Sequence, residues 1–266
     1  MKGILLLLSA ALFLTGCATT QSPTGRGQTL LFSQQEMTQL GDTSFAQIKQ
    51  QEKASQDRAL NAYVSCVANR ITQALPDQSL PWEVVVFDSE QVNAFALPGG
   101  HIGVYTGLLN VAVNSDQLAT VIGHEVAHVL ANHSNEQVSR AQMTGAGMQL
   151  ADLALGAGGI ADKELYMAAL GLGVQVGYIL PYGRSQESEA DVIGVELMAK
   201  AGFDPAASVE LWKNMSKVGG EQGPELLSTH PSHDQRIAQL QQMQAKAQPL
   251  YQANKSSVKN TCQRPK

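Results

Sequence analysis

Two histidines four residues apart, with a glutamate beside the first, give the segment from His124 to His128 the pattern HExxH. On a helix, side chains four residues apart lie one turn apart on one face, so both imidazoles can reach the same metal ion. Glu125 lies about 100° round the helix from His124 and flanks that ion as a general base. The pattern is typical of a zinc peptidase, although five residues alone can match by chance.

A helix is expected here because polar side chains suited to an N-cap precede the motif. Asn114, Ser115 and Asp116 offer capping oxygens, and apolar residues recur at helical spacing from Leu118 to Leu130. A single histidine in such an apolar helix is more often a hydrogen-bonded core residue than a metal ligand. Three titratable groups on one buried stripe are costly without a metal, which favours the ligand interpretation.

Two histidines leave a tetrahedral zinc ion in need of a third protein ligand and a water. A second helical pattern opens at Gly183, and its Glu187 and Asp191 are four apart and share a face. The pair could equally be the acidic start of a solvated helix, where it suits the helix dipole. Beside a zinc helix, Glu187 is the candidate third ligand and Asp191 the acceptor that orients a ligand histidine. Glu189 is expected to point into solvent.

Three ordered motifs, HEVAHVLANH, ESEAD and LLSTHPSHDQR, resemble those of metallopeptidase family forty-eight, a gluzincin family that includes HtpX and the CAAX prenyl protease. The resemblance is closest to the periplasmic LoiP- and BepA-type members, without the helical-repeat domain of the latter. It implies one zinc ion per subunit. The implied zinc ligands are His124, His128 and Glu187. Glu125 is the implied base, and Asp191 is implied to support His124.

The resemblance also gives roles to two residues that spacing alone would not single out. In related proteins the histidine of the matching STHP stretch, here His230, can approach the metal, and the arginine six residues later, here Arg236, lies near the active site. From the residues alone, the stretch could equally be an exposed loop before a polar helix that starts at Pro231. We expect His230 or Arg236 to help stabilise a tetrahedral oxyanion, or His230 to gate the metal.

The expected chemistry is hydrolysis of a peptide bond. A zinc ion held by three side chains lowers the pKa of bound water towards ~7 and polarises the scissile carbonyl. Glu125 would take the proton of the water and return it to the leaving amine. The alternative function is a chaperone or assembly scaffold whose metal site is structural or silenced. Glu125 favours the enzyme, because a structural site has no need of a base.

A small sheet is expected before the zinc helix, giving one α+β, mainly helical domain of the gluzincin type with the sheet beside the HExxH helix. Glu83 to Phe87 is a β-branched run, and Asn93 to Leu97 with Ile102 to Tyr105, joined by Pro98-Gly99-Gly100, read as a hairpin. Peptidases hold an extended peptide against an edge strand, and in the resembling family the matching strand lines the cleft. Ordinary packing on the zinc helix is the alternative.

The amino end predicts export and lipidation. Residues 1–16 read as a signal peptide that ends in a lipobox, Leu14 to Cys17, which leaves Cys17 as the lipidated first residue. The apolar run is too short to span a membrane, whereas two or more acyl chains anchor firmly. By analogy with bacterial lipoproteins, Ala18 fits sorting to the outer membrane, facing the periplasm. A cleaved secretory signal with an incidental Cys17 is the alternative.

Composition suggests the remaining boundaries and partners. Residues 17–30, rich in Thr, Ser, Gly and Gln, look like a lipidated tether, 31–245 form the metallopeptidase domain, and 246–266 form a polar C-terminal tail. The formal net charge of −5 gives no sign of nucleic-acid binding. Cys66 and Cys262 form a disulfide or stay free thiols. We expect an outer-membrane zinc endopeptidase that degrades unfolded, misassembled or stalled envelope proteins.

Overall fold

The computed structural model describes residues 19–157, 183–218, 226, 230, 234–256 and 262–265. The expected signal peptide and the lipidated Cys17 lie outside these residues. The chain divides into two compact units, one of Met1–Gln34 with Asn132–Ile179 and a larger one of Gln35–Ala131 with Leu180–Lys266. Among the residues described, no helix combines the length and the apolar character that a membrane span requires.

The larger unit contains a three-stranded sheet, β3 (Glu83–Phe87), β4 (Ala94–Leu97) and β5 (His101–Tyr105), in the order β3-β5-β4. Strand β3 is parallel to β5, and β4 is antiparallel to it. The expected strand and hairpin are therefore confirmed. The turn between β4 and β5 needs Gly99 and Gly100, whose φ angles of 93° and 90° are rarely adopted by residues with side chains.

The two edges of this sheet differ. Along the outer side of β3, the Ser55 N–H donates to the Val86 carbonyl at 2.8 Å and the Asp88 N–H to the Lys53 carbonyl at 2.7 Å. A short extended segment therefore covers that edge. Among the described residues no strand pairs with the outer side of β4, which leaves it as the open edge.

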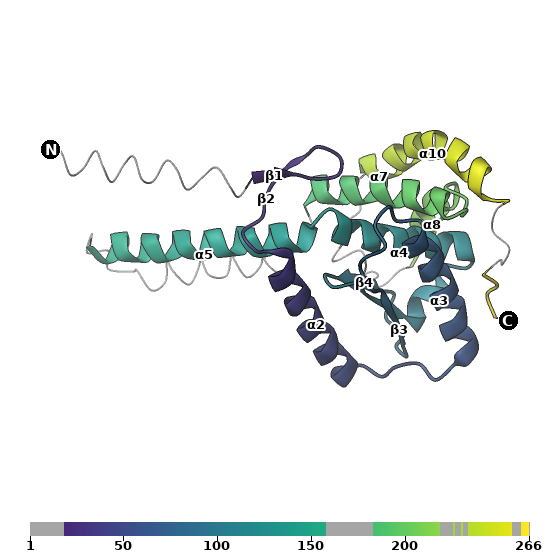
Figure 1. The fold of residues 1–266 in the computed structure, drawn as a ribbon, viewed down its shortest axis with the longest axis horizontal. Helices are drawn as coiled ribbons and strands as arrows, with labels where there is room; N and C mark the ends of the chain where they lie inside the picture. The colour runs from purple at the N-terminus through teal and green to yellow at the C-terminus, as the bar shows by residue number, and fades with distance from the viewer. Residues whose placement is uncertain are drawn as a thin grey trace. The chain divides into compact units, whose positions relative to one another are not determined.

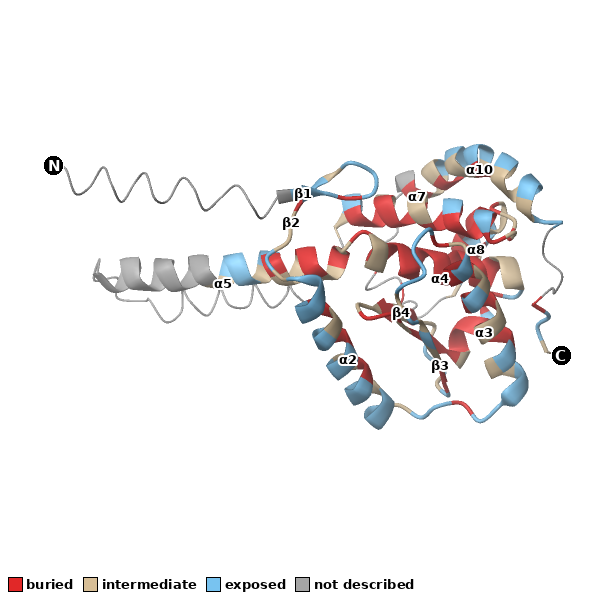
Figure 2. Cartoon of the chain, in the orientation of Figure 1, coloured by how far each residue is buried: buried red, intermediate tan, exposed pale blue. Residues whose placement is uncertain are grey.

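Helix α4 (Ser115–Leu130) lies between the sheet and α7 (Arg184–Lys200) (Figure 1). It begins where expected, because the Asn114 side chain accepts the Gln117 N–H at 2.9 Å. Figure 2 shows α4 and much of α7 buried, while α10 exposes its outer face. The other helical segments of the larger unit are α2 (Gln34–Gln51), α3 (Arg58–Gln73), η1 (Thr106–Asn110), α8 (Ala207–Met215) and α10 (Asp234–Asn254).

The two faces of the sheet enter different clusters, as the alternation of side chains along strands requires. Ala94, Ala96 and Ile102 join the main core with residues of α3, α4 and α7. Phe87 and Phe95 join a separate aromatic cluster around Phe45 of α2, whose ring centroid lies 6.5 Å from that of Phe87.

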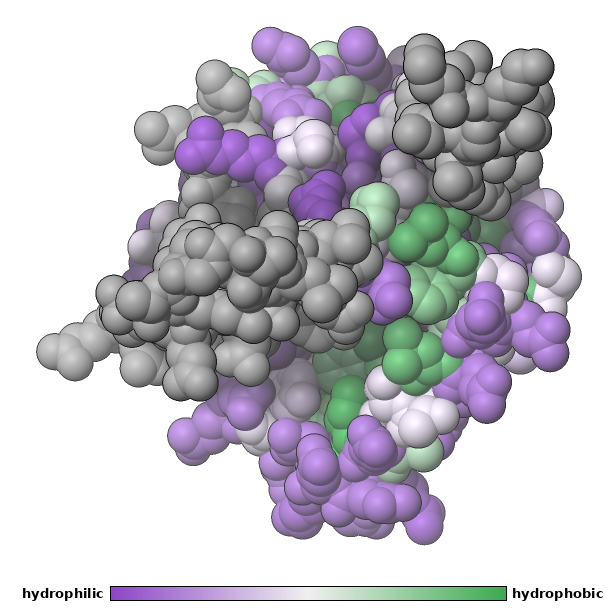
Figure 3. Space-filling view, turned by 90° about the vertical axis from the view of Figure 1, so that its left-hand side faces the viewer, coloured by the Kyte–Doolittle hydropathy of each residue, from purple (hydrophilic) through white to green (hydrophobic). Residues whose placement is uncertain are grey.

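On the face of the molecule drawn in Figure 3, hydrophilic side chains border one band of hydrophobic ones.

In the smaller unit, β1 (Thr19–Gln21) and β2 (Gly27–Thr29) form an antiparallel hairpin beside α5 (His133–Ala157). The Arg26 guanidinium donates to both carboxylate oxygens of Glu136, at 3.0 and 2.8 Å. The described part of the expected tether is thus ordered structure held on a helix. Composition could not reveal this, because the pairing joins residues 110 positions apart in the sequence.

The carboxyl end is more structured than its composition indicates. Helix α10 continues past residue 245, where the polar tail was expected to begin, because Ala247 on its inner face is buried. Beyond it, Cys262 forms a disulfide with Cys66 of α3, with Cα atoms 5.6 Å apart. The structure therefore contains the pairing that the sequence left open.

Candidate metal centre

Helices α4 and α7 approach most closely at a pair of glycines. A Cβ atom built on Gly123 would lie 3.0 Å from the Gly194 carbonyl oxygen, and one built on Gly194 would lie 2.9 Å from the His124 amide nitrogen. Side chains at either position would hold the two backbones apart. The glycine contact therefore brings the carboxylates of Glu187 and Asp191 within reach of His124.

Four buried side chains present donor atoms that all lie within 4.8 Å of one another: His124, His128, Glu187 and His230. His124 Nε2 lies 3.1 Å from His128 Nε2 and 3.4 Å from Glu187 Oε2, and His128 Nε2 lies 3.5 Å from Glu187 Oε1. Two donors bound about 2.0–2.1 Å from a tetrahedral zinc ion are roughly 3.3 Å apart. The spacing and the chemistry of this donor set therefore fit one zinc ion.

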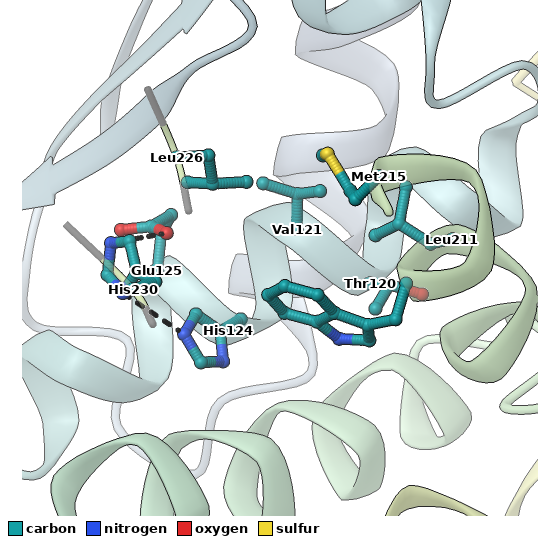
Figure 4. Close-up of a pocket in the computed structure, with 9 residues that line it drawn as sticks. Thr120, Val121, His124, Glu125, Leu211, Met215, Leu226 and His230 are labelled. Carbon is teal, nitrogen blue, oxygen red and sulfur yellow. Dashed lines mark hydrogen bonds and ion pairs between the residues drawn. The ribbon is translucent and has the colours of Figure 1, made fainter. Parts of the chain in front are cut away.

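His230 lies between His124 and Glu125, the expected base (Figure 4). Its Nδ1 lies 2.9 Å from Glu187 Oε1 and 3.4 Å from His124 Nε2, while its Nε2 lies 3.4 Å from Glu125 Oε1. The structure thus places His230 near the metal position, where the family resemblance put it. A fourth protein ligand at a zinc ion takes the place of a catalytic water.

Asp191 and Arg236 lie behind the donor set. Asp191 Oδ1 lies 3.1 Å from His124 Nδ1, an arrangement that fixes the ring and leaves Nε2 for a metal. The Arg236 guanidinium makes two parallel bonds to Asp191, of 2.6 and 2.9 Å, and lies 2.7 Å from Glu187 Oε2. Arg236 was expected to help stabilise an oxyanion, but these bonds make it a positioning residue for the ligands.

The pKa values of the cluster reflect the close pairing of its acidic and basic side chains. Burial and Arg236 lower the pKa of His124, but hydrogen bonds to Asp191 and Glu187 outweigh them and raise it to about 9. Burial raises the pKa of Glu187, but hydrogen bonds from His124 and His230 outweigh it and hold that pKa well below its usual range. Glu187 is therefore ionised, as a metal-binding carboxylate must be.

Glu125 differs from the other carboxylates. Burial raises its pKa, despite the opposing effect of His230 and His124, which suits a group that must accept a proton. Its carboxylate also accepts a hydrogen bond from the backbone of Ala96 on β4. The expected base is therefore fixed against the open edge of the sheet.

Sequence reasoning missed two features of the site. Trp212 of α8 stacks on Arg236, with the guanidinium carbon 3.8 Å from the ring centroid, and no spacing pattern indicated this contact. Glu189 was expected to point into solvent, but it is buried. Helix α7 packs against both α4 and α10, and a helix packed on two sides buries more than one stripe of side chains. The burial of Glu189 follows from this packing.

Residues 45–244 match Peptidase family M48. The mitochondrial metalloendopeptidase OMA1 of Schizosaccharomyces pombe is 37% identical over 188 residues, which are 70% of this chain and 53% of that protein. OMA1 of Arabidopsis thaliana is 34% identical over 231 residues, 85% of this chain and 45% of that protein. The beta-barrel assembly-enhancing protease of Yersinia pestis is 30% identical over 224 residues, 81% of this chain and 45% of that protein.

The chain spans about half the length of these relatives. The matched region contains α4, α7 and all four residues of the donor set. Both the helix that carries HExxH and the helix that carries Glu187 thus fall within the family's own region, and the resemblance that the motifs indicated is confirmed. The chain belongs to peptidase family M48.

Proposed function

We propose that this chain is a zinc-dependent metalloendopeptidase. The observation that carries the proposal is the buried set of His124, His128 and Glu187 with the carboxylate of Glu125 beside it. When bound, zinc would activate a water and polarise the scissile carbonyl. Glu125 accepts the proton of that water and delivers it to the leaving amine, while Asp191 and Arg236 keep His124 and Glu187 in position.

The open edge of the sheet is the proposed place for the peptide. Hydrogen bonds between β4 and β5 occupy the main-chain groups of Phe95 and Leu97, because Asn93 accepts from Tyr105 in the same register. The carbonyl groups of Ala94 and Ala96 then face outward, while the Ala94 N–H donates to Asn93 Oδ1 at 2.9 Å and the Ala96 N–H donates to the Glu125 carboxylate. An extended peptide that pairs with β4 would therefore bring its main chain to the base with little sequence selectivity.

The proposed location in the cell envelope rests on the amino-terminal sequence, the disulfide and the name of one relative. The lipobox at Cys17 favours a lipid-anchored protein at the outer membrane facing the periplasm, and the Cys66–Cys262 disulfide suits an oxidising compartment. One relative is named as a beta-barrel assembly-enhancing protease. We propose that the substrates are misfolded or stalled envelope proteins. A Cys17→Ser variant should then move from the membrane to the soluble periplasmic fraction; unchanged membrane association would contradict the anchor.

A silenced metal site is the second candidate, and the position of His230 favours it. With Nδ1 inside the donor set, His230 can complete the coordination that a water would otherwise share. A chaperone or assembly scaffold could keep such a closed site. An enzyme would need His230 to withdraw, so His230→Ala should raise the cleavage rate if the closed arrangement limits turnover.

Zinc content and cleavage of casein test the proposed function in wild type and in Glu125→Gln. We expect one zinc ion per chain in both proteins. Cleavage by the variant should be slower by at least about 10³-fold, since Glu125 transfers the proton of the attacking water. If wild type and Glu125→Gln both bind zinc, and neither wild type nor His230→Ala cleaves casein, the result would favour the scaffold. A chain that binds no zinc would contradict both.

A further inference from the structure

Trp212 is a buried aromatic side chain of α8 that lies against the metal centre and offers it no ligand atom. Its indole ring is stacked on Arg236, with the guanidinium carbon 3.8 Å from the ring centroid. The His124 ring meets the indole edge to face, with centroids 6.5 Å apart and planes at 76°. Trp212 therefore contacts both a candidate zinc ligand and the residue that bonds to Asp191 and Glu187.

The hydrogen bonds of Arg236 lie along the edge of its planar guanidinium group. Its Nε and one terminal nitrogen donate to Asp191 at 2.6 and 2.9 Å, and the other terminal nitrogen lies 2.7 Å from Glu187 Oε2. A guanidinium donates within its own plane, so these bonds leave its two faces uncovered. Because Arg236 is only 1% exposed, the indole of Trp212 takes the place that water has at an exposed guanidinium.

The attraction between the two groups comes from the face of the indole ring. This face carries partial negative charge and attracts a cation above it, more strongly where water is excluded. The indole N–H is not part of this contact, since Nε1 of Trp212 is buried and has no hydrogen-bond partner among the residues that the structure describes. Trp212 thus acts on Arg236 through the charge and the shape of its ring.

A displaced Arg236 would disturb the zinc ligands in turn. Its two parallel bonds to Asp191 require the guanidinium and the carboxylate to share one plane. Asp191 Oδ1 lies 3.1 Å from His124 Nδ1 and orients that ring. A guanidinium that tilts away from the indole would leave this plane, and both His124 and Glu187 would lose support. Residues that orient metal ligands in this way typically change metal affinity by about 10–100-fold.

We propose that Trp212 is a positioning residue of the zinc site, and that the face of its indole ring holds the Arg236 cation in the plane that the ligands require. The inference rests on the proposed zinc peptidase function and deepens it. In this role Trp212 touches neither the metal nor the peptide bond. Its contribution to zinc affinity depends on the electron density of the ring as well as on the space that the ring fills.

Fluorinated tryptophan tests this dependence with little change in the shape of the side chain. The chain has two tryptophans, so Trp82→Phe leaves Trp212 as the only position that takes up the analogue. Each added fluorine withdraws electrons from the ring face and weakens its attraction for a cation. Zinc affinity, measured by competition with a chelator, should fall stepwise with mono-, di- and trifluorotryptophan, by about tenfold over the series. Zinc affinity that stays unchanged, or that rises with fluorination, would overturn the proposal.

Two substitutions separate the ring face from the bulk of the side chain. Trp212→Phe keeps an aromatic face and should retain zinc affinity within about threefold of wild type. Trp212→Leu keeps an apolar side chain without such a face and should weaken zinc binding by about tenfold or more. Equal losses in the two variants would overturn the role of the ring face. If Trp212→Leu does not fold, the fluorinated series decides the question by itself.

The matched control is Phe203→Leu. Phe203 is 1% exposed and stacks on Arg70, whose guanidinium carbon also lies 3.8 Å from the ring centroid. Arg70 donates to the Ala201 carbonyl at 2.6 Å, and this stack lies outside the donor set. Phe203→Leu should lower the urea midpoint and leave zinc affinity unaltered. A loss of zinc affinity as large as that in Trp212→Leu would assign the effect to general loosening and overturn the proposal.

Zinc affinity and casein cleavage separate this proposal from the proposed function. Zinc binding is measured without turnover, so it reports on Trp212 even in a chain that cleaves nothing. Weaker zinc binding on fluorination, in a protein that does not cleave casein, would support the role of Trp212 and overturn the peptidase. Cleavage by wild type, together with zinc affinity that fluorination leaves unchanged, would do the reverse.

Discussion

At the residue scale, the metal centre depends on side chains that bind no metal. Arg236 is 1% exposed and stacked on Trp212, and it bonds to Asp191 and Glu187 together. A buried guanidinium in this position offsets the charge of two carboxylates and fixes their geometry. The orientation of His124 and of Glu187 thus depends on one residue of α10, far from both in sequence.

Replacing Arg236 by lysine should weaken zinc binding by about 10–100-fold, since an ammonium group cannot make two parallel bonds to a carboxylate. Competition with a chelator of known affinity measures this. Arg70→Lys is the matched control, because the Arg70 guanidinium carbon also lies 3.8 Å from an aromatic centroid, that of Phe203. It should change stability alone; unaltered zinc affinity in Arg236→Lys would contradict the positioning role.

Spacing indicated three residues of the donor set, because helical periodicity is local. His124, His128 and Glu187 fall together in the structure as their positions on two helices indicated. The bonding of Arg236 and the stacking of Trp212 could not be read from spacing, since both depend on how α10 packs against α7 and α8. Long-range packing of this kind leaves no periodic signal in the chain.

At the element scale, the crossing of α4 and α7 sets the distance between the two motifs. Gly123 and Gly194 meet at this crossing without side chains between them. The helices and the hairpin were predictable from caps, periodicity and the glycine turn. The parallel pairing of β3 with β5 was not predictable, because it joins residues 18 positions apart, such as Glu83 and His101, across the intervening β4. The hairpin of β1 with β2 was not predictable either, because the polar composition of its segment indicated a tether.

Gly194→Ala should lower the free energy of unfolding by about 1–3 kcal/mol and weaken zinc binding, because its Cβ would press on the backbone of the zinc helix. Urea unfolding and zinc titration test both effects. Gly145→Ala in α5 is the control, since no described atom lies within 4 Å of a Cβ built there. That change should stabilise by about 0.5–1 kcal/mol; equal effects of the two changes would contradict the close crossing.

At the scale of the whole molecule, the Cys66–Cys262 disulfide joins positions 196 residues apart. The chain-entropy account of such a long loop gives up to about 5 kcal/mol of stabilisation. Reduction should therefore lower the urea midpoint of wild type. The double variant Cys66→Ser, Cys262→Ser should unfold at the urea midpoint of reduced wild type, and reductant should not change its midpoint. If reductant leaves the midpoint of wild type unchanged, the result would contradict the disulfide.

Metal removal should also act on the whole unit, because a folded donor set binds zinc and an unfolded chain lacks its geometry. At zinc concentrations about 100 times the dissociation constant, the thermal midpoint should rise by roughly 5–10 °C over chelator-treated protein. Scanning calorimetry measures the difference. Glu187→Gln should show much less of it; an equal rise in this variant would place the metal elsewhere.

The disulfide has a further consequence for a chain that is cut. The larger unit comes from Gln35–Ala131 and Leu180–Lys266, with Asn132–Ile179 between them. Cys66 falls in the first stretch and Cys262 in the second. A single break between the stretches would therefore leave α4 and α7 on two fragments that stay covalently linked. The nicked protein would migrate as one species without reductant and as two with it, and it would keep both halves of its metal centre.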